Sequence, residues 1–134
     1  MQAKPLLSIV IVNYNGLRFL DECIASIAQH VRCSHEVIVV DNASADGSAQ
    51  YIESAFPQVR LICSDVNTGF TGGNNLGVRA AQGDLVLLLN NDTKLLGPID
   101  DAVDAFGNAK LGALGVHPVS YTHLRAHETR HDLV

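Results

Sequence analysis

Five consecutive aliphatic residues, Leu85–Leu89, end abruptly in Asn90, Asn91 and Asp92. A continuous apolar run of this length indicates a strand buried on both faces, as in a parallel sheet. In open α/β sheets, ligands bind in the crevice beyond the carboxyl ends of the strands. The segment 85–92 therefore predicts a strand of such a sheet with polar side chains at the edge where binding sites form.

Asp92 has two interpretations when it is considered alone. A hard oxygen ligand in this position suits Mg²⁺ or Mn²⁺, which hold substrate phosphates with only one or two protein carboxylates. Asn and Asp are equally common as residues that shape a turn or begin a helix. This segment alone favours neither interpretation, and the motifs in the rest of the chain are needed to choose between them.

Strand and helix patterns alternate along the chain, and each strand is followed by turn residues. The remaining strands are predicted at residues 7–12, 37–40, 59–63 and 111–116. Helices are predicted at 17–31, 46–56 and 99–106, and a further helix follows the glycine-rich segment 67–75 and ends at about Ala81. Asp46 or Ser44 is the expected N-cap of the second helix, and Pro57 ends it. Alternation of this kind implies right-handed crossovers. The predicted fold class is α/β, with a Rossmann-like, mainly parallel sheet flanked by helices.

Composition limits the function classes. The chain has 134 residues, 47% of them hydrophobic, and a net charge of −5, which describes one globular domain. An acidic balance without a basic run does not indicate nucleic-acid binding. Three cysteines without metal-ligand spacing indicate reduced thiols and a cytoplasmic protein. The N-terminal residues contain no signal peptide or membrane anchor, which leaves a peripheral membrane association open.

Three polar segments follow buried strands and are expected to meet at the carboxyl edge of the sheet: 13–16, 41–47 and 90–92. There, the Asp41 carboxylate can accept hydrogen bonds from a base or a ribose, and Tyr14 offers a face for stacking. The chain has neither a G-x-G-x-x-G turn nor a Walker motif to hold phosphates. This absence favours a metal at Asp92.

The glycine-rich segment Gly69–Gly77 also has two interpretations. Gly72 and Gly73 allow the backbone to approach a ligand closely, and a following helix N-terminus would favour a diphosphate. Alternatively, the glycines only permit a tight turn and close packing. Without the neighbouring motifs, the packing interpretation is preferred.

The order and wording of these motifs resemble those of the family 2 glycosyltransferases. The matching stretches are Ser8–Gly16, Val39–Ser48, Asn67–Gly77 and Leu87–Asp92. The sequence is similar to the N-terminal, nucleotide-binding part of that family, and its Asn-Thr-Gly-Phe and Asn-Asn-Asp motifs resemble the rhamnosyltransferase-like branch. The resemblance implies the GT-A fold of nucleotide-diphospho-sugar transferases, truncated here.

The resemblance also implies roles for individual residues. Asp92 would be the ligand of a divalent metal, Mg²⁺ or Mn²⁺, in the acidic motif of the family, although Asn90 stands where many members have the first acid. The residues implied to bind the nucleotide sugar are Tyr14, Asn15, Asp41, Asn42, Gly72, Asn74 and Asn91.

The implied reaction is an inverting sugar transfer from a UDP- or dTDP-sugar to a glycan or lipid-linked acceptor. It would take place in the cytoplasm or at the cytoplasmic face of the membrane. The catalytic base of the family comes from later in the chain, and no matching segment is found, so this chain is expected to be inactive alone. A non-catalytic nucleotide-binding module of the same fold is the alternative.

The C-terminal segment has a different character. His127–His131 spells the zinc-peptidase motif H-E-x-x-H, but no third ligand and no apolar helix face accompany it, so a peptidase is disfavoured. Val119–Thr129 resembles the translation of a transposase adapter used in sequencing libraries. The glycosyltransferase-like domain is therefore predicted at residues 1–117, with a non-native tail at 118–134.

Overall fold

The computed structural model describes residues 5–106, in which strands and helices alternate. The elements are β1 (Leu7–Asn13), α1 (Leu17–His30), β2 (His35–Asn42), α2 (Ser48–Ala55), β3 (Arg60–Ser64), α3 (Gly69–Ala80), β4 (Leu85–Asn90) and α4 (Asp100–Ala105). The first four predicted strands and the helices between them are confirmed. The predicted strand at 111–116, the zinc-peptidase motif and the tail at 118–134 lie outside the described residues.

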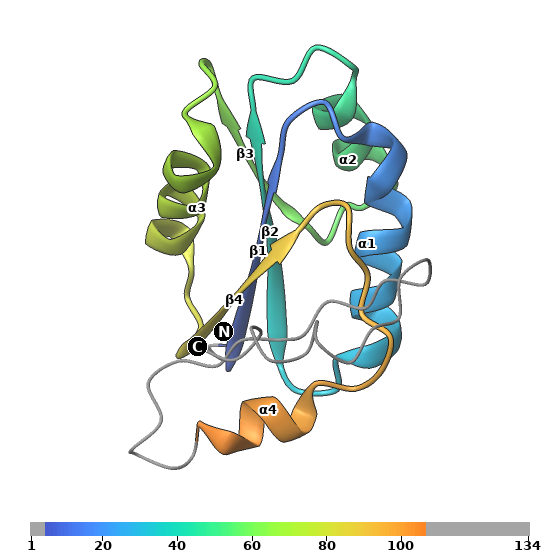
Figure 1. Ribbon diagram of the computed structural model, residues 1–134, viewed down its shortest axis with the longest axis vertical. Helices are drawn as coiled ribbons and strands as arrows, with labels where there is room; N and C mark the ends of the chain where they lie inside the picture. Colours follow the sequence, from blue (N-terminus) through green and yellow to red (C-terminus); the bar gives the residue numbers. More distant parts are fainter. Residues whose placement is uncertain (1–4, 107–134) are drawn as a thin grey trace, which may run out of the picture. The chain divides into compact units, whose positions relative to one another are not determined.

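The four strands form one sheet in the order β3-β2-β1-β4, and every neighbouring pair is parallel (Figure 1). Their carboxyl ends point towards the top of Figure 1. The register places Asn13 of β1 beside Asp41 of β2, and Val12 of β1 beside Asn90 of β4. The ends of three strands therefore lie next to one another at one edge.

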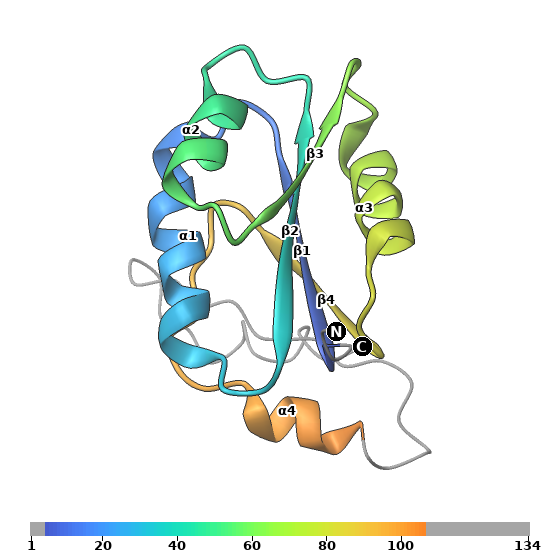
Figure 2. The same cartoon turned by 180° about the vertical axis from the view of Figure 1, so that it is seen from behind.

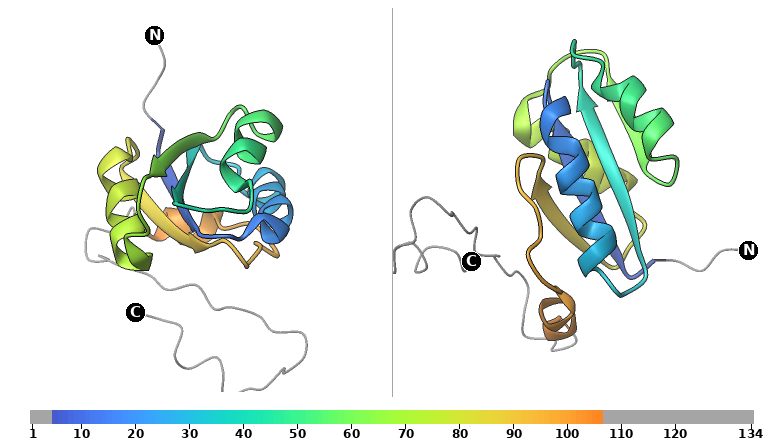
Figure 3. Two further views of the ribbon diagram at one scale, coloured as in Figure 1. Left: turned by 90° about the horizontal axis from the view of Figure 1, so that it is seen from above. Right: turned by 90° about the vertical axis from the view of Figure 1, so that its right-hand side faces the viewer.

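Helices cover both faces of the sheet. Helices α1 and α2 lie on one face and α3 lies on the other (Figures 2 and 3). The two middle strands carry most of the core, because nearly all of their residues are buried. Fully buried side chains from both layers fill it: Ile9, Ile11, Leu20, Ile27, Ile38 and Ile52. This core fixes the strand ends that carry the candidate site.

Strand β4 corrects the expectation that its apolar run is buried on both faces. Its residues alternate between half-buried and exposed, with Val86 41% and Leu88 50% exposed. The reason is strand order, because β4 pairs only with β1 among the described residues and occupies the edge of their sheet. Its parallel pairing was predicted correctly, and its burial was not.

Helix α3 begins at Gly69, so Gly72 and Gly73 lie inside a helix rather than in the expected loop. A Cβ atom at Gly73 would lie 2.7 Å from Cγ1 of Val12, and one at Gly77 would overlap the Val10 side chain. These two glycines allow α3 to pack directly against β1. The structure thus supports the packing interpretation of the glycine-rich segment.

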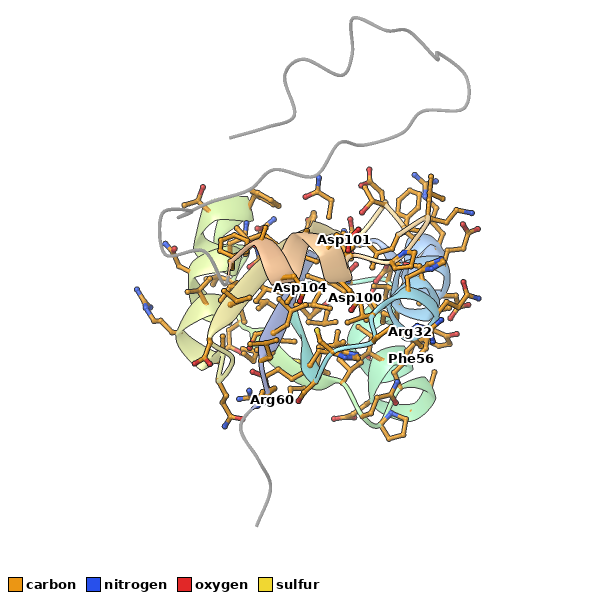
Figure 4. The ribbon with its side chains drawn as sticks, turned by 90° about the horizontal axis from the view of Figure 1, so that it is seen from below. Arg32, Phe56, Arg60, Asp100, Asp101 and Asp104 are labelled. Carbon is orange, nitrogen blue, oxygen red and sulfur yellow. The ribbon has the colours of Figure 1, made fainter. Side chains whose placement is uncertain are left out.

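Residues 5–98 belong to one compact unit, and a second unit begins at Ile99. The helix α4 of the second unit carries Asp100 and Asp101 in its first turn, and both are labelled with Asp104 in Figure 4. Acids in this position are favourable because of the positive end of the helix dipole. No helix within residues 5–106 is long and apolar enough to span a membrane.

Candidate functional site

A buried asparagine joins the ends of three strands. The Asn13 amide nitrogen donates to Oδ1 of Asp41 at 3.0 Å and, more weakly, to Oγ of Ser44 at 3.4 Å. Its oxygen accepts a hydrogen bond from Nδ2 of Asn91 at 2.9 Å. The segments 13–16, 41–47 and 90–92 therefore meet at the carboxyl edge, as the sequence predicts, and hydrogen bonds hold them together.

Asp41 is a buried carboxylate, with only 3% of the residue exposed. Its two oxygens accept hydrogen bonds from Asn13 and from the backbone N–H of Ser44, the latter at 3.1 Å. No cation pairs with it among residues 5–106. Each carboxylate oxygen has two acceptor positions, so Asp41 retains capacity for further donors. A buried charge without an ionic partner is costly unless hydrogen bonds compensate it.

The loops after β1 and β2 are bonded to each other. The backbone N–H of Asn15 donates to Oγ of Ser44 at 2.9 Å, and the Asn15 side chain accepts from the N–H of Ala45 at 2.8 Å. Asn15 and Ala43 both have positive φ, 50° and 64°. That conformation is uncommon for residues other than glycine, and Ala43 has no polar side chain to stabilise it. Strained residues of this kind cluster at functional sites.

Asp46 connects the beginnings of two helices. One of its oxygens accepts from the N–H of Leu17, the first residue of α1, at 3.0 Å. The other accepts from the N–H of Ser48 at 3.0 Å and from its hydroxyl. Burial raises the pKa of Asp46, but these hydrogen bonds outweigh that effect and lower it below its usual value. The predicted N-cap is wrong by position, because Gly47, with φ 86°, occupies it.

Asn42 holds the beginning of α3. Its side-chain oxygen accepts from the N–H of Thr68 at 2.9 Å and from the Thr68 hydroxyl at 3.0 Å, and its Nδ2 donates to the carbonyl of Gly69 at 2.9 Å. Only 1% of Asn42 is exposed. The contacts observed for this side chain are thus structural, and its predicted contact with a nucleoside stays a prediction.

The turn after β4 carries Asn91 and Asp92. Asn91 is half-buried and points to Asn13, and a Cβ atom at Gly16 would overlap the Asn91 amide. Asp92 is exposed, and its negative charge affects the pKa of the Cys23 thiol in α1. Burial, and secondarily the charge of Asp92, raise the pKa of Cys23 to about 12. The two neighbouring side chains therefore have different surroundings. Asn91 belongs to the hydrogen-bond network around Asn13, which also includes Asp41 and Ser44, and Asp92 lies outside it.

The metal prediction rests on Asp92 alone. Within residues 5–106, no three His, Cys, Asp or Glu side chains gather as a ligand set. The Asp92 carboxylate makes no hydrogen bond or ion pair with another described residue. A free, exposed carboxylate fits an ion such as Mg²⁺ or Mn²⁺, which needs only one or two protein ligands besides water and phosphates.

The other predicted residues lie around this edge. Tyr14 is 52% exposed at the end of β1, and its ring is available for stacking. Gly72 lies in the first turn of α3, where a Cβ atom would collide with the Thr68 side chain. Asn74 in α3 is 8% exposed, and its amide finds no hydrogen-bond partner within residues 5–106. A buried, unpaired amide is unusual and is consistent with a site that a ligand completes.

Three residues of the network were not among the predicted site residues: Asn13, Ser44 and Gly16. All three lie inside the polar segments that the sequence singles out. The usable signal was positional, because Asn13 and Asp41 both come at the end of a buried strand and so end up beside each other. Which residue of each segment faces inward depends on the local turn geometry, which the pattern does not specify.

Comparisons with known proteins identify relatives of this chain. The family model "Glycosyl transferase family 2" matches residues 8–120. The succinoglycan biosynthesis protein ExoO of Rhizobium meliloti is 34% identical over 89 residues, which cover 66% of this chain and 26% of ExoO.

Two solved structures share the fold. Staphylococcus aureus TarS (residues 1–349) in complex with UDP has a TM-score of 0.68 at 23% identity, over 78% of this chain and 32% of TarS. The mannosyltransferase PcManGT of Pyrobaculum calidifontis, in complex with GDP-Man and Mn²⁺, has a TM-score of 0.66 at 21% identity. The match covers 84% of this chain and 34% of PcManGT. These likenesses assign the GT-A fold, and the chain spans about a quarter to a third of the length of these proteins.

Proposed function

The chain belongs to glycosyl transferase family 2, and from this premise we propose that the full-length protein is an inverting, nucleotide-sugar-dependent glycosyltransferase. The donor is a UDP- or dTDP-sugar, and the acceptor is a glycan or a lipid-linked sugar. Support for the donor class comes from the UDP complex of TarS, and support for a glycan product from the name of ExoO. The residues described here provide the nucleotide and metal half of the site.

One observation carries the proposal: Asp41, Asn13 and Asn91 form a hydrogen-bonded row across the ends of β2, β1 and β4. Asp41 keeps free acceptor positions for N–H or O–H groups of a nucleoside. The exposed ring of Tyr14 lies one residue after Asn13 and suits stacking on a base. We therefore place the nucleoside over the ends of β1 and β2.

We place the diphosphate towards the end of β4, beside Asp92. A divalent ion at Asp92 would neutralise the charge of the diphosphate leaving group. The protein's part is to hold that ion close to the nucleoside contacts, which the Asn91–Asn13 hydrogen bond does by fixing the turn. The Mn²⁺ in the PcManGT complex supports a metal of this class. The unpaired Asn74 amide is a further group for the donor.

The proposal includes no general base from this chain. Deprotonation of the acceptor hydroxyl requires a carboxylate or histidine within hydrogen-bond reach of it, and the family motif for that base has no counterpart among the motifs recognised here. We expect the chain alone to bind the donor nucleotide without transferring sugar. Sugar transfer by this chain alone would contradict that part of the proposal.

Calorimetry tests the donor site. We expect UDP or dTDP to bind the wild-type chain, and Mn²⁺ to increase the affinity. Asp92→Asn should remove most of the Mn²⁺ effect, whereas Asp41→Asn should weaken binding with and without metal. Asp101→Asn, which removes an exposed acid of α4, is the matched control and should bind as the wild type does. Nucleotide binding that ignores Mn²⁺, Asp92 and Asp41 alike would overturn the proposed site.

A further inference from the structure

Asn13 is fully buried, so it has no surface with which to touch a donor sugar or nucleotide. Its amide nevertheless contacts groups on both sides of the proposed site, Asp41 on the nucleoside side and Asn91 on the metal side. A polar side chain at 0% exposure is retained only when its hydrogen bonds are satisfied. Asn13 therefore connects the two sides of the proposed site through these hydrogen bonds.

The chemistry of the three groups fixes the direction of the hydrogen bonds. An ionised carboxylate only accepts, so the Asn13 atom facing Asp41 must be its NH₂ group. The Asn13 oxygen then faces Asn91, and Asn91 must turn its own NH₂ group towards it. As a result, the Asn91 oxygen is directed away from that bond, and it has no hydrogen-bond partner among residues 5–106. The charge on Asp41 thus determines which atom Asn91 leaves free.

We propose that Asn13 is a positioning residue that couples the two halves of the donor site by orienting Asn91. This inference rests on the proposed function. Asp41 sets the orientation of Asn13, and Asn13 sets that of Asn91, which leaves the Asn91 carbonyl oxygen free in the residue next to Asp92. An amide oxygen is a hard ligand that can coordinate a divalent cation directly or accept hydrogen bonds from the waters around it. Occupation of the nucleoside side and of the metal side is therefore linked through Asn13.

The absence of a side chain at Gly16 leaves the space that the hydrogen bond between Asn13 and Asn91 needs. A Cβ atom there would lie 2.6 Å from Oδ1 of Asn13 and would overlap the Asn91 amide. The hydrogen bond between these two asparagines thus passes through space that any other residue at position 16 would fill. Helix α1 begins directly after this glycine, so the row is also anchored to the first turn of a helix.

The test measures how many-fold Mn²⁺ increases UDP affinity, in the wild-type chain and in variants. Asn13→Leu keeps the approximate size of the side chain and removes its hydrogen bonds to Asp41 and Asn91, together with the weaker one to Ser44. We expect it to reduce the Mn²⁺ enhancement about tenfold, within the usual range of coupling between two sites. Asn91→Leu should have the same effect, and the double variant no more than either one, because both break one row.

Ser26→Ala is the matched structural control. Ser26 is buried, accepts from the N–H of Leu95 at 2.9 Å and donates to the carbonyl of Cys23 at 2.7 Å, but takes no part in the row. It should lower thermal stability and leave the Mn²⁺ enhancement as in the wild type. Should Asn13→Leu fail to fold, the comparison of Asn91→Leu with Ser26→Ala decides.

The outcomes separate the two proposals. Wild-type binding with a Mn²⁺ enhancement that Asn13→Leu and Asn91→Leu leave intact would overturn the coupling and keep the proposed function. Losses that multiply in the double variant, or an equal loss in Ser26→Ala, would also overturn it. A wild-type chain whose nucleotide affinity does not respond to Mn²⁺ contradicts the proposed function, and the coupling with it.

Discussion

Gly16 and Asn91 lie so close together that position 16 has no room for a side chain. A Cβ atom at Gly16 would overlap Nδ2 of Asn91, the atom that donates to Asn13 across the ends of β4 and β1. Two residues separated by most of the described chain thus depend on each other. The hydrogen bond between Asn91 and Asn13 therefore requires glycine at position 16 as well as the two amide groups.

Gly16→Ala is expected to destabilise the chain by about 1–3 kcal/mol, the usual cost of adding a methyl group to a filled space. The new methyl group would displace Asn91 and break its bond to Asn13, so Mn²⁺-dependent UDP binding should weaken as well. Urea unfolding and calorimetry measure the two effects. Gly97→Ala is the control, because nothing lies within 4 Å of a Cβ atom there. Equal stability of the two variants would contradict the packing described.

Gly77→Ala tests the contact between α3 and β1. Alanine favours a helix over glycine by about 1 kcal/mol, yet its methyl group would overlap the Val10 side chain. Overpacking costs about 1–3 kcal/mol, so we expect a net loss in the free energy of unfolding. Adding Val10→Ala to Gly77→Ala should cost less than the sum of the two single losses, because it frees the space. Additive losses would show that the two residues do not compete for it.

Glu36 predicts a pH dependence of stability. It accepts hydrogen bonds from Oγ of Ser8 at 2.6 Å, from the N–H of Gln82 at 2.7 Å and from Nη1 of Arg60 at 2.6 Å (Arg60 is labelled in Figure 4). Burial alone raises the pKa of Glu36, but these bonds and the charge of Arg60 lower it overall below its usual 4.5. The folded state therefore binds this proton more weakly than the unfolded chain does.

The sign follows from that difference. The stabilisation from Glu36 is fully present above about pH 4.5 and is lost as the pH falls through the lowered pKa of the folded state. Thermal melts between pH 7 and pH 3 should show Glu36→Gln less stable than the wild type at neutral pH and less sensitive to acid. Some sensitivity should remain, because the pKa of Asp46 is lowered too. Parallel curves for wild type and Glu36→Gln would refute the assignment.

The sequence contains enough information to predict the alternation of elements, since buried aliphatic runs and turn residues are local signals. It does not contain the position of a strand within the sheet. The apolar run of β4 looks the same whether it is central or at an edge, which is why the exposure of Val86 and Leu88 was missed. The beginning of α3 was misread for another reason: Gly72 and Gly73 disfavour a helix by themselves, and the close packing of Gly73 on Val12 of β1 overrides that preference.

The site was predictable as a set of segments but not as a set of contacts. The segments that contain Asp41 and Asn91 were identified because each follows an aliphatic run, and the family resemblance then singled out these two residues. Asn13 was not, because its importance comes from lying opposite Asp41 in the register and next to Gly16, both of which are tertiary relationships. Asn42 shows the opposite case, since a residue predicted to touch the nucleoside is bonded to Thr68 and Gly69.

The most direct test of the account is the location of bound Mn²⁺. The paramagnetic ion broadens the NMR signals of nearby amides, and Mg²⁺ serves as the diamagnetic control. With UDP and Mn²⁺ added to the ¹⁵N-labelled chain, we expect the strongest broadening at residues 90–93, then at 13–16 and 41–46, with sharp signals at Glu36, Arg60 and Gln82. Strongest broadening at the acids of α4, or at the Glu36 end of the sheet, would contradict a donor site at the carboxyl edge.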